Sequence, residues 1–145
     1  MARFSAGGLT TAGSTTLPVV ALVGSAGVHA RVREIGVFNT TATAVALKIV
    51  RLTTAGTPGA TLTSQNGSVD PTSSIALLKN TYSSTAPTTV DMGYRCVLGA
   101  AVGSGFVWTF EDFDLTTLVA ANSGVGILVE NGTGQALQTY WKWLE

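Results

Sequence analysis

Hydrophobic and polar residues alternate with a period of two along most of the chain from Leu17 onward, which is typical of half-buried β-strands. β-branched and aromatic residues cluster between turns rich in glycine, asparagine, threonine and proline, and no segment sustains a helical period with a cap. The spacing predicts about eight strands, as in a sandwich. We expect these strands at 17–23, 28–38, 44–52, 75–79, 94–102, 105–111, 125–130 and 136–144, with a further short strand at 115–120.

Because the pattern predicts no helix that could connect parallel strands, the strands should pair antiparallel. The expected fold is therefore an all-β, jelly-roll-like β-sandwich. Alternation within the strands assigns the faces that point toward the core. The residues predicted to point inward are Phe106, Trp108 and Phe110; Val125, Ile127 and Val129; and Leu137, Thr139, Trp141 and Trp143. The glycine-rich turn at 131–134 joins the last two strands as a hairpin.

The strand predicted at 28–38 breaks its own alternation. Val32 alternates with Arg31 and Arg33, but Ile35 falls on the parity of the arginines. Either a bulge near Glu34 or burial of both faces beyond that point would resolve the conflict. Around the short strand at 75–79, residues 53–80 are rich in threonine, serine and glycine and poorly periodic. We expect them to form a loop excursion.

The first sixteen residues are small, polar and glycine-rich, with apolar side chains at Phe4 and Leu9. They predict an extended N-terminal arm over 1–16, followed by a single β-sandwich domain over 17–145. An arm that becomes ordered on binding loses conformational entropy, so it needs apolar anchors of this kind. The partner interface is therefore expected on the arm and the C-terminal edge, at Arg3, Phe4, Leu9, Tyr140 and Leu144.

Charged residues make up only 11% of the 145 residues, against roughly 25% in ordinary soluble domains. Eight basic and eight acidic residues cancel, which leaves no cationic surface for nucleic acid or anionic lipid. No apolar run reaches the roughly 18 to 20 residues that a membrane-spanning helix needs. A free monomer of this size usually keeps a charged surface. We therefore expect this chain to hide much of its outside against copies of itself or a partner.

Residue types that support catalysis are scarce. Cys96 is the one cysteine, so no internal disulfide can form, and His29 is the one imidazole, which excludes a histidine-rich metal cage. Nucleophilic catalysis needs a base beside the nucleophile, and His29 lies in a predicted strand as a surface residue. Cys96, within an apolar run, is expected to be a small core residue.

The one acidic cluster consists of Glu111, Asp112 and Asp114. Two oxygen ligands at this spacing can begin a calcium loop, and paired carboxylates can hydrolyse glycosides. The further ligands and the glycine of an EF-hand are missing, so we interpret the cluster as a solvated turn. The sequence thus predicts no enzyme, no cofactor and no metal site.

Four segments resemble small structural proteins of tailed bacteriophages: 33–41 (REIGVFNTT), 51–59 (RLTTAGTPG), 93–110 (GYRCVLGAAVGSGFVWTF) and 130–135 (ENGTGQ). The resemblance runs from about Arg31 to the end of the chain. It implies a capsid decoration or cement protein on the exterior of the virion, with a β-sandwich or jelly-roll body. Such proteins typically form trimers that brace neighbouring shell subunits. The implied partners are therefore further copies of the chain and the major capsid protein, and no catalytic motif is carried over.

The expected function is that of a non-enzymatic structural virion protein that stabilises a capsid as an oligomer, with a trimer favoured. One alternative remains open at this point, a phage tail or fibre-tip domain that binds host surface carbohydrate. That alternative predicts an exposed tyrosine or tryptophan beside Asp112 and Asp114, because aromatic faces stack on sugars. We favour the core for Trp141 and Trp143, which leaves Tyr140 and Leu144 for a partner.

Overall fold

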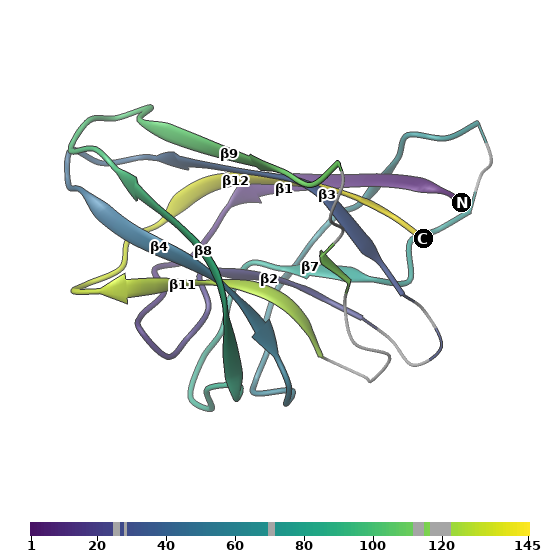
Figure 1. The fold of residues 1–145 in the computed structure, drawn as a ribbon, viewed down its shortest axis with the longest axis horizontal. Coiled ribbons are helices and arrows are strands. Elements are labelled where there is room, and N and C mark those ends of the chain that lie inside the picture. The colour runs from purple at the N-terminus through teal and green to yellow at the C-terminus, as the bar shows by residue number, and fades with distance from the viewer. Residues whose placement is uncertain (25–26, 28, 70–71, 112–114, 117–122) are drawn as a thin grey trace.

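The computed structural model describes residues 1–145 except 25–26, 28, 70–71, 112–114 and 117–122 (Figure 1). The described strands form two antiparallel sheets packed face to face, which confirms the expected all-β sandwich. Among the described residues, no helix has the length and apolar composition needed to cross a membrane.

The first sheet has the strand order β10-β3-β12-β1-β6, and β9 pairs with β3 beside β10. Its strands are β1 (Arg3–Leu9), β3 (Arg31–Asn39), β6 (Gln65–Asn66), β9 (Gly105–Thr109), β10 (Leu115–Thr116) and β12 (Leu137–Leu144). The second sheet has the order β5-β7-β2-β11-β4-β8. Its strands are β2 (Val20–Val23), β4 (Val45–Leu52), β5 (Thr61–Leu62), β7 (Leu77–Lys79), β8 (Thr89–Leu98) and β11 (Gly124–Asn131).

The core lies between the sheets, and the alternation predicted most of it. The inward residues of β12 and the predicted residues of β11 are all buried, and Trp108 and Phe110 are buried as well. Phe106 is an exception to the predicted inner face, because it is 40% exposed at the start of β9. The large side chains that are completely buried include Trp141, Trp143, Leu22, Ile35, Leu47, Ile49 and Ile127.

The broken alternation of β3 is explained by a bulge, as the sequence allowed. Glu34 pairs with Lys142, but Val32 pairs with Trp143, so Arg33 is an extra residue on β3. The bulge shifts the register by one residue and returns Ile35 to the buried face.

The predicted N-terminal arm is wrong for residues 3–9. They form β1, which lies between β12 and β6 within the first sheet, so the sandwich begins before residue 17. Phe4 and Ala6 alternate inward and are buried, while seven residue pairs join β1 to β12. Small residues favour this pairing, because a Cβ at Gly7 would lie 2.8 Å from the carbonyl oxygen of Thr139. After β1 the chain turns back toward β2 over residues 10–19.

The excursion at 53–80 also contains regular structure that the sequence did not predict. β5 extends the second sheet beside β7, and β6 extends the first sheet beside β1. β8 begins at Thr89, earlier than predicted, and ends at Leu98. The predicted strand at 115–120 is present as β10 over Leu115–Thr116, and residues 117–120 lie outside the described part of the chain.

Candidate interaction surfaces

The residues weighed for catalysis or metal binding are dispersed in the structure. His29 and Glu111 are exposed, whereas Cys96 is buried and burial raises the pKa of its thiol to about 12. A thiol with so high a pKa is a poor nucleophile. Asp112 and Asp114 lie outside the described residues. Within the described residues, no group of three or more histidine, cysteine or acidic side chains is placed to hold a metal ion.

Four of the five predicted interface residues lie on the outer face of the first sheet. β1 and β12 are neighbours, so Arg3 pairs with Leu144, and Tyr140 lies opposite Gly7 toward the other end of the ladder. Leu9 is 52% exposed, and Tyr140 and Leu144 are half-buried. The fifth residue, Phe4, is a correction. Its ring is 4% exposed and stacks on Trp143 with centroids 6.0 Å apart, so it belongs to the core and is closed to a partner.

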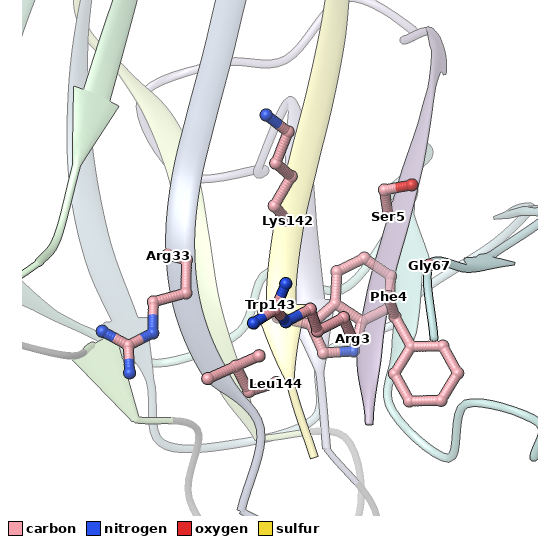
Figure 2. Close-up of a pocket in the computed structure, with 8 residues that line it drawn as sticks. All are labelled: Arg3, Phe4, Ser5, Arg33, Gly67, Lys142, Trp143 and Leu144. Carbon is pink, nitrogen blue, oxygen red and sulfur yellow. The ribbon is translucent and has the colours of Figure 1, made fainter. Parts of the chain in front are cut away.

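An open groove of about 500 Å³ lies over the start of β1 and the end of β12 (Figure 2). Figure 2 shows Arg3 reaching from β1 across β12, with Leu144 beneath it and Arg33 on the far side. Arg33 donates to the carbonyl oxygens of Phe110 and Glu111 at 3.4 and 3.3 Å. The groove therefore combines the cations Arg3, Arg33 and Lys142 with the apolar side chains of Phe4, Trp143 and Leu144. The chain itself engages Arg33 in these hydrogen bonds.

Beside the groove, the ring of Tyr140 lies over Gly36 on the outer face of the first sheet. Its ring occupies the space that a Cβ at Gly36 would need, and Phe38 stacks on it with centroids 6.1 Å apart. Lys142 lies 5.6 Å from the ring centroid and 2.8 Å from the carboxylate of Glu34. Hydrogen bonds from Lys142 and Tyr140 lower the pKa of Glu34, and the bond to Glu34 raises the pKa of Lys142. These contacts fix the side chains of Tyr140, Lys142 and Glu34 relative to one another on the outer face of the first sheet.

Four loops meet at the end of the sandwich opposite the two chain termini, and we call this region the four-loop end (Figure 1). The loops are 10–19, 40–44, 99–104 and 132–136. Asn39, at the end of β3, is 2% exposed, and its side chain is fully engaged in hydrogen bonds. Its Nδ2 donates to the carbonyl oxygens of Thr43 and Gly99 at 2.6 and 2.9 Å, and its Oδ1 accepts from Gln135 Nε2 at 2.6 Å. One buried amide thus ties three of the loops together.

Further hydrogen bonds connect the same end. Thr40 Oγ1 donates to the carbonyl oxygen of Ala136 at 2.6 Å, and the amide of Gly103 donates to the carbonyl oxygen of Asn39 at 2.8 Å. The loop at 10–19 joins through the Val129 amide, which donates to the carbonyl oxygen of Ser14. Because a satisfied buried network of this kind rigidifies the groups that it joins, the four-loop end is preorganised.

Exposed apolar side chains wrap around the corner of the four-loop end where β8 turns into β9. We call them the apolar end patch: Val97, Ala100, Ala101, Val102, Phe106 and Val107. Val97 and Val102 are 71% and 72% exposed. Sequence reasoning did not find this patch, because it assigned Phe106 to the core. The available signal was the lack of any charged residue from Cys96 through Phe110.

Comparisons with protein families, with curated proteins and with solved structures find no match to this chain.

Proposed function

We propose that this chain is a non-enzymatic structural protein of a tailed-bacteriophage virion. It decorates the outside of the capsid as an oligomer, with a trimer favoured, and it bridges neighbouring subunits of the major capsid protein. The observation that carries the proposal is the apolar end patch on a surface that is poor in charge. Apolar patches of this kind mark surfaces that are covered by another protein.

The strand order supports a jelly-roll body. Within the two sheets, β1-β12-β3-β9 faces β2-β11-β4-β8, and the connections between these strands cross repeatedly from one sheet to the other. This is the order of a double Greek key, the arrangement of jelly-roll domains in viral shells and in lectins. Because lectins share it, the order alone does not separate the decoration hypothesis from carbohydrate binding. All three tryptophans are buried, however, so none is free to stack on a sugar.

The segments that resemble phage structural proteins support the proposal in a second way. Three of them, 33–41, 93–110 and 130–135, are far apart in the sequence, yet each contributes to the four-loop end. The loop portions of these three segments therefore lie together at one end of the sandwich.

The proposed mechanism is additive burial. Each copy covers a modest apolar area, and the many copies on a shell resist its expansion collectively. A preorganised surface suits this role, because side chains and loops that are already ordered lose little entropy on binding. The four-loop end satisfies that condition through Asn39 and its partners.

The proposal is tested by measuring the native mass of the protein over a wide concentration range and its cosedimentation with shells. The shells are empty capsids of the encoding phage assembled without this chain, and the control is shells already saturated with it. We expect a trimer whose mass does not depend on concentration. It should cosediment with bare shells but not with saturated shells. A protein that fails to bind bare shells but retains glycans of the host surface would overturn the proposal in favour of the fibre-tip alternative.

A further inference from the structure

We propose that the apolar end patch is the surface at which copies of this chain meet around the symmetry axis of their oligomer. The inference rests on the proposed oligomeric function and deepens it, because it assigns the contact between copies to one corner of the sandwich. The occupant of the patch is thus a second copy of this chain.

The main argument is the distribution of charge. At a symmetry axis each residue lies close to its own counterpart in the next copy, so a charged side chain there meets a like charge. None of the loops 10–19, 40–44, 99–104 and 132–136 contains a charged residue, and neither does the stretch from Cys96 to Phe110. An ordinary surface would place roughly one charge in every four residues. A contact with a different protein carries no such requirement, so the charge-free end favours a contact between copies.

The outer faces of the two sheets, in contrast, carry charged side chains. On the second sheet, Arg95 lies 2.6 Å from both Asp91 and Glu130, and Lys48 lies 4.0 Å from Asp91. On the first sheet, the groove is lined by Arg3, Arg33 and Lys142. Identical copies that met at either surface would bring each of these charges close to its own counterpart wherever it lay near the axis.

The sheet edges beside the patch differ in how well they are protected. β8 stands at the edge of the second sheet among the described strands, and Gly93, with a φ of +83°, interrupts its ladder with β4. Such a bulge, together with the charge of Arg95, protects an edge from pairing with another chain. Among the described strands β9 has only β3 as a neighbour, and it carries neither a charge nor a register shift. An edge without protection is expected where a further copy covers it.

A stable contact between copies takes more residues than the six of the apolar end patch. A standard interface buries about 800 Å² on each partner, which is about an eighth of the 6599 Å² surface of this chain. The contact must therefore extend beyond the apolar end patch into neighbouring loops. The loops at 40–44 and 132–136 adjoin the patch, are free of charge and are fixed by Asn39.

The test uses matched substitutions on β8 and in the loop that follows it, in the full-length chain. Val97→Lys and Val102→Lys place a charge in the patch, whereas Val90→Lys, at the other end of β8 and 56% exposed, is the control. Sedimentation velocity should show that each patch variant weakens association at least tenfold, while the control keeps the parent mass. All three side chains are exposed, so melting temperatures should stay within a few degrees of the parent. Patch variants that keep the parent mass would overturn the inference.

A second pair of variants tests whether the contact is between identical surfaces. Val102→Asp should weaken association as strongly as Val102→Lys, because in either case the introduced charge is repelled by the same charge on the next copy. An equimolar mixture of the two should recover part of the oligomer, since opposite charges then meet at some of the contacts around the axis. If one variant weakens association while the other strengthens it, and the mixture recovers no oligomer, the patch faces a charged partner and the inference is wrong.

Failure of the inference is distinguishable from failure of the proposed function. A monomeric parent that still binds bare shells would overturn the contact between copies and leave the decoration hypothesis intact. An oligomer that dissociates in the patch variants but never binds shells would support the inference and overturn capsid decoration.

Discussion

At the scale of single residues, burial separates side chains that the alternation groups together. Phe106 and Trp108 share one parity on β9, and their rings meet edge to face with centroids 5.0 Å apart. Trp108 lies opposite Ile35 and is 6% exposed, whereas Phe106 lies opposite Val37, closer to the four-loop end, and is 40% exposed. The alternation gives the direction of a side chain but not the point along a strand where the core ends.

This difference predicts unequal costs of truncation. Trp108→Ala should lower the free energy of unfolding by about 3 to 5 kcal/mol, as for other core aromatics. Phe106→Ala should cost the isolated chain about 1 kcal/mol, the value of an aromatic pair, because the residue is 40% exposed there. Urea unfolding of both variants at one protein concentration measures the two values. Equal losses would contradict our assignment of the core boundary on β9.

Glu145 shows a residue role that no sequence pattern indicated. Its carboxylate accepts hydrogen bonds from the hydroxyl of Ser74, the amides of Ile75 and Ala76, and the indole of Trp143, at 2.6 to 2.9 Å. The partners are about 70 residues away or belong to a buried ring. Their meeting depends on the packing of the whole sandwich, which local sequence does not encode.

At the scale of elements, the long strands were predictable because they combine strict alternation with large β-branched or aromatic side chains. β12 is an example, with Trp141 and Trp143 inward and Lys142 outward. β1 was missed because its inward side consists largely of small residues, so the contrast between its faces is weak. β5 and β6 have two residues each, too few to show a period. Their pairing is set by the neighbouring strands.

The position of β1 predicts the effect of removing it. The arm hypothesis expects a chain without residues 1–16 to fold normally. In the structure, deletion of residues 1–9 removes a strand between β12 and β6 and withdraws Phe4 from Trp143. We expect the truncated chain to lose more than about 3 kcal/mol, the cost of one core phenylalanine, or to lack a cooperative thermal transition.

Deletion of Met1 alone, which is 77% exposed, is the matched control and should melt like the parent. Circular dichroism during heating measures both variants. A chain without residues 1–9 that melts with the parent would restore the arm hypothesis.

The candidate surfaces could be predicted only in part, because they depend on which strands pair with each other. Arg3, Tyr140 and Leu144 do share one outer face, but that follows from the pairing of β1 with β12, which are more than 120 residues apart. The four-loop end likewise depends on connections that cross between the sheets. The absence of charge was visible in each loop separately, and the topology is needed to see that the loops form one surface.

At the scale of the whole molecule, the cationic groove and the apolar end patch lie toward opposite ends of the sandwich. The groove with Arg3 and Leu144 lies toward the chain termini, and the apolar end patch lies at the opposite end (Figure 1). A protein that bridges shell subunits as an oligomer needs two separate contacts, one for its copies and one for the shell. The structure offers two surfaces of different chemistry for these contacts.

This division predicts how the oligomer responds to salt. Raising the ionic strength from 0.1 to 1 M shortens the Debye length from about 10 to 3 Å and weakens contacts between exposed charges. A contact built on the charge-free four-loop end should be insensitive to this screening, so the native mass should remain that of the oligomer at both salt concentrations. Sedimentation velocity at low protein concentration measures it. Dissociation at 1 M would instead place the contact between copies on a charged surface, with the groove beside Arg3 and Lys142 as the first candidate.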